Sequence, residues 1–228
     1  MILASARESA EAAGEGFMTA GEIRELAARA GIGPGVTVLD LCCGVAGPGR
    51  LLTRELGCDY LGVDEDANAV AHARRLAGEL PCRFEVAHVP PLPAGTFDVV
   101  LLLETMLAFT DKDALVREVA AALGPGGRFA FTLEEGSPLT AAERAAMPNS
   151  GTVWLTPIDE LTASLERAGL EITWIDDLSR AHSARAQALA HAYAAEEVYD
   201  LVATHRLWAR WLDAGRARKL AVVANRVI

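Results

Sequence analysis

The sequence predicts an α/β fold, a doubly wound and mostly parallel sheet of about seven strands with helices on both faces. Short apolar runs rich in β-branched residues alternate along the chain with segments of helical periodicity, an alternation typical of parallel sheets. The first apolar run, residues 36–41, contains Asp40 and leads through a loop with Gly44, Gly47 and Gly49 into a helical pattern. Strand, glycine loop and helix in this order begin folds that bind a nucleotide at the carboxyl edge of the sheet.

The remaining elements follow in order. An amphipathic helix precedes the first strand and has Ile23, Leu26, Ala27 and Ala30 on one face. We expect strands at 36–41, 60–63, 83–86, 99–103, 129–133, 171–176 and 219–227, and helices at 48–55, 68–79, 112–123 and 157–168. The segment 179–214 is rich in alanine and lacks proline, which predicts a pair of helices inserted between the last two strands.

Composition indicates one domain over residues 1–228, since 51% of the residues are apolar and no linker interrupts them. A formal net charge of −10 argues against a nucleic-acid partner. The sequence shows neither a membrane-length apolar run nor a signal-peptide pattern, and its four cysteines form no metal-binding or disulfide pattern. We therefore expect a cytoplasmic monomer or homodimer with no metal and no membrane partner.

The glycine loop and a second acid define the expected ligand. Asp64 ends the second apolar run twenty positions after Gly44, and a carboxylate there can accept hydrogen bonds from both ribose hydroxyls. A dinucleotide site would need G-x-G-x-x-G, whereas this loop has G-x-x-G-x-G and Leu52 in the last glycine's place. Asp40, as a carboxylate at the end of the first strand, is placed to attract a cationic group of the ligand and not a phosphate. The residues favour S-adenosylmethionine over NAD, and a glycine turn without a ligand is the remaining alternative.

Three motifs resemble class I S-adenosylmethionine-dependent methyltransferases. DLCCGVAGPGR resembles the family's first motif, with Cys42 and Ala46 where glycine is commoner, and GVDEDANAV resembles the second. The stretch from Phe97 to Thr132 is similar to the fourth strand, its helix and the turn into the fifth strand. The resemblance covers roughly residues 31–175 and implies a Rossmann-like sheet whose last strand is antiparallel. The G-x-x-G-P-x-R variant is particularly similar to small-molecule C-methyltransferases.

The resemblance and the strand-end positions together give the expected cofactor contacts. The third strand departs from the family, because Val86 stands where relatives place an acid that contacts adenine. Main chain, apolar sandwiching or His88 must then hold adenine, unless His88 is only a surface residue. The expected cofactor-binding residues are Asp40, Gly44, Gly47, Asp64, Glu65, Ala87, His88, Leu103 and Glu104.

Glu104 is the expected catalytic residue. It is a lone acid after four apolar residues, where the fourth strand reaches the ligand edge of the sheet. In similar C-methyltransferases an acid at the matching position faces the reacting carbon. Its alternative roles are to hold the methionine ammonium or to cap the following helix. Weaker candidates for a base are Glu134, Glu135, His182, His191, Tyr193, Tyr199 and His205.

Three segments are candidates for the acceptor site: an N-terminal helical cap at 1–30, a lid loop at 134–156, and the helical insertion at 179–214. Apolar side chains there favour a small apolar or aromatic metabolite, with C-methylation favoured over O- or N-methylation, in specialised metabolism. The expected acceptor-binding residues are Phe17, Met18, Met106, Trp154, His182, His191 and Tyr193. A catalytically silent S-adenosylmethionine-binding sensor or scaffold is the alternative. A third, an RNA or protein methyltransferase, would need a basic groove or an N-P-P-Y type acceptor loop, and this sequence has Glu-Thr-Met after Leu103 instead.

Overall fold

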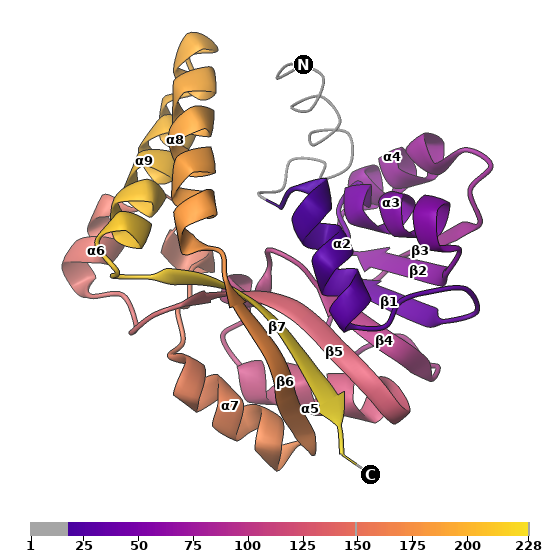
Figure 1. Ribbon diagram of the computed structural model, residues 1–228. Coiled ribbons are helices and arrows are strands. Elements are labelled where there is room, and N and C mark those ends of the chain that lie inside the picture. Colours follow the sequence, from indigo (N-terminus) through magenta and orange to yellow (C-terminus); the bar gives the residue numbers. More distant parts are fainter. Residues whose placement is uncertain (1–17, 149, 228) are drawn as a thin grey trace.

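The computed structural model describes residues 18–148 and 150–227. Seven strands form a single sheet in the order β3-β2-β1-β4-β5-β7-β6 (Figure 1). The pairs from β3 to β5 are parallel, and β7 is antiparallel to both β5 and β6. The mostly parallel sheet with an antiparallel last strand is therefore confirmed. The strands are β1 (Thr37–Leu41), β2 (Asp59–Asp64), β3 (Cys82–Val86), β4 (Phe97–Leu102), β5 (Leu123–Glu135), β6 (Leu170–Asp177) and β7 (Arg218–Arg226).

Helices cover both faces of the sheet. On one face α2 (Ala20–Arg29), α3 (Gly47–Leu56) and α4 (Ala67–Ala77) pack on a core with the side chains of Val38 and Tyr60. On the other, α5 (Lys112–Ala122) and α7 (Ile158–Arg167) pack on a core with Leu39. Because neighbouring residues of β1 enter opposite cores, the strand is apolar on both faces, as a buried parallel strand must be.

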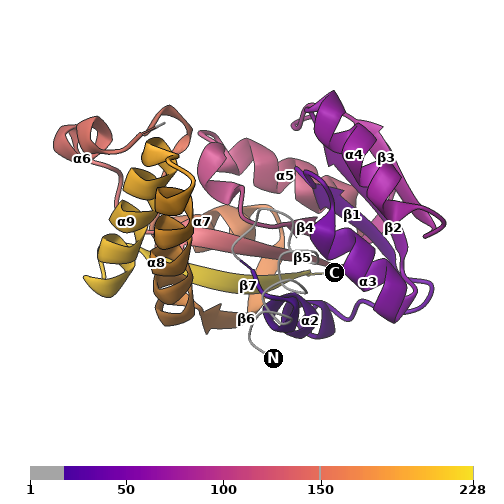
Figure 2. The same cartoon turned by 90° about the horizontal axis from the view of Figure 1, so that it is seen from above.

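The remaining elements lie at one end of the sheet. The segment 179–214 forms α8 (Ser179–Ala195) and α9 (Tyr199–Asp213), which pack together and project beyond the strands (Figures 1 and 2). The turn η1 (Met106–Ala108) follows β4. A small third core joins residues after β5 to α9 and contains Met147, Leu155 and Trp211. Within the described residues, no helix combines the length and the apolar character that a membrane span requires.

The main differences from the sequence expectations concern β5 and the segment after it. β5 begins at Leu123, whereas the sequence predicted its start at 129. β5 extends to Glu135, past the expected end at 133, because Glu134 and Glu135 lie opposite Lys219 and Arg218 of β7 and the charges are complementary. The segment 134–156, expected as a loop, contains α6 (Ala141–Ala146) and the turn η2 (Ser150–Thr152). A capping box between Thr140 and Glu143 begins α6.

Candidate active site

The loop between β1 and α3 has a left-handed backbone at three alternating positions. Cys42, Gly44 and Ala46 have φ of 55°, 53° and 56°. A left-handed backbone costs a residue with a Cβ about 1 kcal/mol, so Cys42 and Ala46 are strained. Among the described residues, no atom outside the loop itself lies within 4 Å of where a Gly44 Cβ would stand. The main chain is therefore accessible at Gly44, while Gly47 begins α3 and is buried.

Asp64 joins this loop to the end of β2. One carboxylate oxygen accepts a 2.8 Å hydrogen bond from the Gly44 main-chain N–H, and the other accepts one of 2.9 Å from Asp66. The sequence spacing thus brings the two expected cofactor residues into direct contact. Each carboxylate oxygen has a further lone pair, so both can still accept hydrogen bonds from a ligand.

Asp40 lies beneath the loop. Only 2% of the residue is exposed, and its carboxylate accepts a 2.6 Å hydrogen bond from the Tyr60 hydroxyl. Burial raises the pKa of Asp40 to about 7, against the lowering effect of the Tyr60 hydrogen bond. The Tyr60 ring fills the space where a Cβ at Gly49 would stand, 2.0 Å from its Cζ. A glycine is required at position 49 so that α3 can pack on this ring.

The ends of β2 and β3 bring the expected adenine-side residues together. The Ala87 N–H donates a 3.0 Å hydrogen bond to the Asp64 carbonyl, which aligns the two strand ends. His88 Nδ1 lies 2.7 Å from Glu65 Oε2, and both side chains are mostly exposed. His88 is therefore held at the rim of the site beside the Gly44–Asp64 contact.

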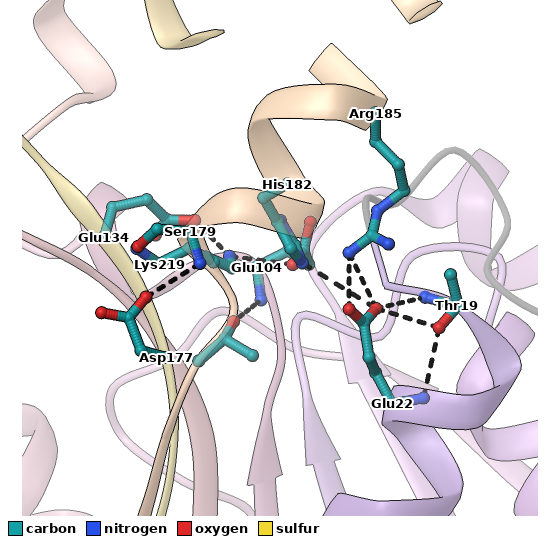
Figure 3. Close-up of polar contacts among 10 residues, drawn as sticks. Thr19, Glu22, Glu104, Glu134, Asp177, Ser179, His182, Arg185 and Lys219 are labelled. Atoms are coloured by element: carbon teal, nitrogen blue, oxygen red, sulfur yellow. Dashed lines mark hydrogen bonds and ion pairs between the residues drawn. The ribbon is translucent and has the colours of Figure 1, made fainter. Parts of the chain in front are cut away.

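Glu104 is not an isolated acid, contrary to the expectation from its apolar neighbours. Its Oε1 lies 2.8 Å from the Lys219 ammonium, whose residue is 3% exposed, and Lys219 also contacts Glu134 (Figure 3). The Glu104 N–H donates a 2.7 Å hydrogen bond to the Thr132 hydroxyl. Leu103, beside it, is 8% exposed. Glu104 is thus held by side chains of β5 and β7.

The insertion and the N-terminal helix meet next to Glu104. Arg185 on α8 donates to both carboxylate oxygens of Glu22 on α2, at 2.7 and 2.8 Å (Figure 3). His182, one turn earlier on α8, is 2% exposed and lies 3.9 Å from Glu22. Burial and the nearby Lys219 lower the pKa of His182 to about 4, so its imidazole is neutral at pH 7.

The structure separates the expected acceptor residues. His182 lies beside Glu104, whereas His191 lies about 14 Å further along α8 and is exposed. Tyr193 packs on His205, with 5.2 Å between the ring centroids. Met18 and Met106 are buried in different cores, and Trp154 is 37% exposed with Arg144 over its ring. Phe17 lies outside the described residues.

Other sequence candidates have structural partners or are exposed. Glu135 pairs with Arg218 at 2.8 Å, and Tyr199 is 69% exposed. Burial raises the pKa of Cys42 to about 12 and that of Cys43 well above its ordinary range, so neither thiol is a nucleophile at neutral pH. Across the described ranges, no group of three His, Cys, Asp or Glu side chains is arranged to hold a metal.

Four residues of this site were not expected from the sequence: Lys219, Thr132, Glu22 and Arg185. Lys219 has a detectable signal, since Arg218–Lys219 on the last strand complements Glu134–Glu135 once the two strands are paired antiparallel. Glu22 belongs to a Thr19-x-x-Glu22 capping box that can be read from the sequence. Thr132 and Arg185 have no local signal, because their partners lie 28 and 163 positions away.

Comparison with known proteins agrees with the geometry. Residues 38–127, which hold the glycine loop, Asp64 and Glu104, match a family model described as a methyltransferase domain. This match and the methyltransferase relatives support a class I S-adenosylmethionine-dependent methyltransferase. The cofactor of this family is S-adenosylmethionine. A relative, methyltransferase GfsG of Streptomyces halstedii, is 32% identical over 68% of this chain and 60% of that protein. The chain thus spans less than two thirds of the length of this relative.

Solved structures share the fold of this chain. Geranyl diphosphate C-methyltransferase from Streptomyces coelicolor A3(2), in complex with Mg²⁺, geranyl diphosphate and S-adenosylhomocysteine, superimposes with a TM-score of 0.76. It is 19% identical, and the alignment covers 91% of this chain and 79% of that one. The [4+2]-cyclase SpnF superimposes with a TM-score of 0.74 at 20% identity, over 90% and 80% of the two chains. These likenesses show the fold.

Proposed function

We propose that this protein transfers a methyl group from S-adenosylmethionine to a small-molecule acceptor. The observation that carries the proposal is the Gly44–Asp64 contact at the carboxyl edge of the sheet, beside main chain that no described side chain covers. An adenosine ligand fits this place, because a ribose can approach Asp64 while an extended chain crosses Gly44. Bound S-adenosylmethionine supplies a methyl group on a sulfonium that is already reactive toward nucleophiles.

The cofactor contacts divide by strand. Asp64 would accept hydrogen bonds from the ribose hydroxyls, and Glu65 with His88 would border the adenine. Ala87 and Leu103 would contribute main chain and apolar surface at the ends of β3 and β4. Asp40 is buried under the loop and accepts a hydrogen bond from Tyr60, so we propose that it supports the loop and does not contact the ligand directly.

Glu104 is the residue that we propose for the chemistry. It leaves β4 at the ligand edge and is held by Lys219 at 2.8 Å. For a carbon acceptor, the acceptor carbon gains the methyl group and loses a proton, and Glu104 would take that proton or stabilise the cation before its loss. For an oxygen or nitrogen acceptor, in-line placement of the nucleophile would supply most of the rate increase.

The acceptor site would lie between α2, α8 and the segment 134–156, which meet the sheet around Glu104. His182 contributes a neutral polar group beside Glu104 there, while Met18 lies in the core behind it. A small apolar or aromatic acceptor in specialised metabolism fits these groups. The similarity to methyltransferase GfsG and to geranyl diphosphate C-methyltransferase supports a small-molecule acceptor and C-methylation.

A cofactor-turnover assay tests the proposal. Calorimetry with S-adenosylhomocysteine should show binding, and an assay with apolar and aromatic acceptors of differing nucleophilic atoms should release S-adenosylhomocysteine with one of them. Binding without turnover across carbon, oxygen and nitrogen acceptors would favour the second candidate function below. Absence of binding to the folded protein would contradict both.

A catalytically silent S-adenosylmethionine-binding protein is the second candidate. The observation that favours it is the pair Cys42 and Ala46, whose side chains occupy left-handed positions of the ligand loop. The structural neighbour SpnF is a [4+2]-cyclase, so another activity occurs on this fold. The Glu104–Lys219 arrangement favours the enzyme, since a buried charged cluster is costly to keep.

A further inference from the structure

Lys219 lies between two carboxylates at the carboxyl end of the sheet. It is directly opposite Glu134 in the antiparallel β5–β7 pair, so both side chains stand on the same face. Its ammonium contacts Glu134 and lies 2.8 Å from Glu104 (Figure 3). The Lys219 side chain is 3% exposed, against 19% for Glu104 and 12% for Glu134. The lysine therefore stays within the protein while Glu104 retains access to the site.

The backbone of Glu104 is strained and held in place. Its φ is +67°, a left-handed value that costs a residue with a Cβ about 1 kcal/mol. The Glu104 main-chain N–H donates a 2.7 Å hydrogen bond to the Thr132 hydroxyl, and Lys219 holds the Glu104 carboxylate. A strained residue persists only where its surroundings over-determine its position, and such residues cluster at functional sites.

The charges around Lys219 leave an excess of one carboxylate. With both carboxylates ionised, Glu104, Glu134 and Lys219 together carry one negative charge, and burial raises the pKa of Glu134 above its ordinary value. Burial alone would lower the pKa of Lys219, but the two carboxylates outweigh it and raise the pKa, so the lysine stays charged. Charged or titratable groups from other elements also face this trio: His182 and Arg185 on α8, Glu22 on α2, and Lys112 on α5. His182 is neutral, Arg185 is paired with Glu22, and Lys112 donates to two main-chain carbonyls.

We propose that Lys219 is a positioning residue for methyl transfer: its ammonium holds the Glu104 carboxylate in one orientation and keeps it ionised beside the acceptor. The proposal rests on the proposed function of Glu104. Without the lysine, two carboxylates would share a buried space without a cation between them, and one would take up a proton. A protonated Glu104 neither accepts a proton nor stabilises a cation.

The test is a double-mutant cycle of Lys219→Met and Glu104→Gln, with Arg218→Met as the matched control. Arg218 pairs with Glu135 at the neighbouring register position and is 44% exposed. For each variant, kcat, KM and S-adenosylhomocysteine affinity are measured from pH 5 to pH 9. The carboxyl C=O infrared band of the protein without ligands is titrated in parallel.

Lys219→Met should lower kcat about 100-fold at pH 7 and move the acid limb of its pH profile up by about one unit or more. Its S-adenosylhomocysteine affinity should stay within about threefold. In the Glu104→Gln background, Lys219→Met should cost no more than about a further threefold, because a residue that acts through Glu104 has nothing left to act on. Arg218→Met should change kcat and the acid limb by less than about twofold.

Multiplicative losses in the double variant, or a Lys219→Met profile with an unmoved acid limb, would overturn the proposal. The double variant also addresses folding, since it leaves one buried carboxylate, Glu134, without a cation where Lys219→Met leaves two. If the wild-type protein methylates no acceptor, the proposed function fails. The infrared titration alone then decides whether Lys219 keeps the Glu104 carboxylate ionised. Proton uptake at raised pH in Lys219→Met that moves to lower pH in the double variant, where Glu134 is the remaining carboxylate of the three, supports the role of Lys219, and an unmoved titration overturns it.

Discussion

The main-chain N–H of Gly44 donates a 2.8 Å hydrogen bond to the Asp64 carboxylate, which joins the glycine loop after β1 to the end of β2. Two residues twenty positions apart in the sequence thus form one surface. The contact fixes the loop in its left-handed conformation and aims a carboxylate at the edge of the sheet. Its consequence is that substitutions at Asp64 act on the ligand and on the loop together.

Asp64→Ala should weaken S-adenosylhomocysteine binding at least tenfold. The variant loses hydrogen bonds to two ribose hydroxyls, each worth about 1.5–3 kcal/mol when a carboxylate accepts. Asp64→Asn is the matched control, because its one carbonyl oxygen can keep the bond from Gly44. Calorimetry measures the S-adenosylhomocysteine affinity of both folded variants. An alanine variant with unchanged affinity would exclude Asp64 from the ribose site.

Gly44→Ala should reduce cofactor affinity at least tenfold while the protein stays folded. The left-handed backbone adds about 1 kcal/mol of strain, which the loop already tolerates at Cys42 and Ala46. The new methyl group meets open space in the described structure, so a loss of affinity must come from collision with a ligand.

Ala46→Gly is the control for this loop. It relieves strain of about 1 kcal/mol but loses a buried methyl group worth about 0.8 kcal/mol, so stability should hardly change. Cofactor affinity should be equal or higher. If Gly44→Ala binds as tightly as the wild-type protein by calorimetry, the glycine serves only the turn.

The sequence predicted the sheet well because buried parallel strands are apolar on both faces and stand out from their surroundings. β1, β2 and β3 each begin one residue from the expected start. The end of β5 was predicted wrongly because Glu134 and Glu135 mask its continuation, and their charge is explained only by Lys219 and Arg218 opposite them. Local patterns describe a strand, whereas such partners depend on register.

The part of the site formed by the glycine loop and Asp64 was predictable from the sequence. The part formed by elements far apart in the sequence was not. Gly44 and Asp64 follow from spacing, and their contact is in the structure. The Glu104 environment combines β5, β7 and α8, whose relative placement no local pattern encodes. Cys42 and Ala46 stand where glycine is commoner in the family, and the backbone shows the physical reason, since both residues are left-handed.

Asp40 and His182 should give opposite dependences of stability on pH. The pKa of Asp40 is about 7 when folded and 3.8 as an ordinary carboxyl, so stability falls as pH rises from about 4 to 7. The pKa of His182 is about 4 against an ordinary 6.5, so stability falls as pH drops from about 6.5 to 4. Each slope is at most about 1.4 kcal/mol per pH unit, and the two largely cancel.

Single variants should expose these two slopes. In Asp40→Asn, which can keep the bond from Tyr60, the free energy of unfolding should rise more steeply from pH 4 to 6.5 than in the wild-type protein. In His182→Asn it should instead fall more steeply over pH 4 to 7. Urea denaturation at four pH values across this window measures the difference. A variant whose slope matches the wild-type slope would show that its group titrates normally in the fold.

Glu104→Gln tests the chemical role of the carboxylate. Glutamine keeps the shape and one acceptor oxygen, so the contact with the Lys219 ammonium can persist at about its 2.8 Å length. If Glu104 removes a proton or stabilises a cation, turnover should fall by about 10²–10⁴-fold while S-adenosylhomocysteine affinity stays within a few-fold. Steady-state kinetics and calorimetry on the same preparation separate the two effects. A parallel fall of affinity and turnover would instead assign Glu104 to the methionine ammonium. Full activity would leave placement of the nucleophile as the mechanism and would remove the preference for a carbon acceptor.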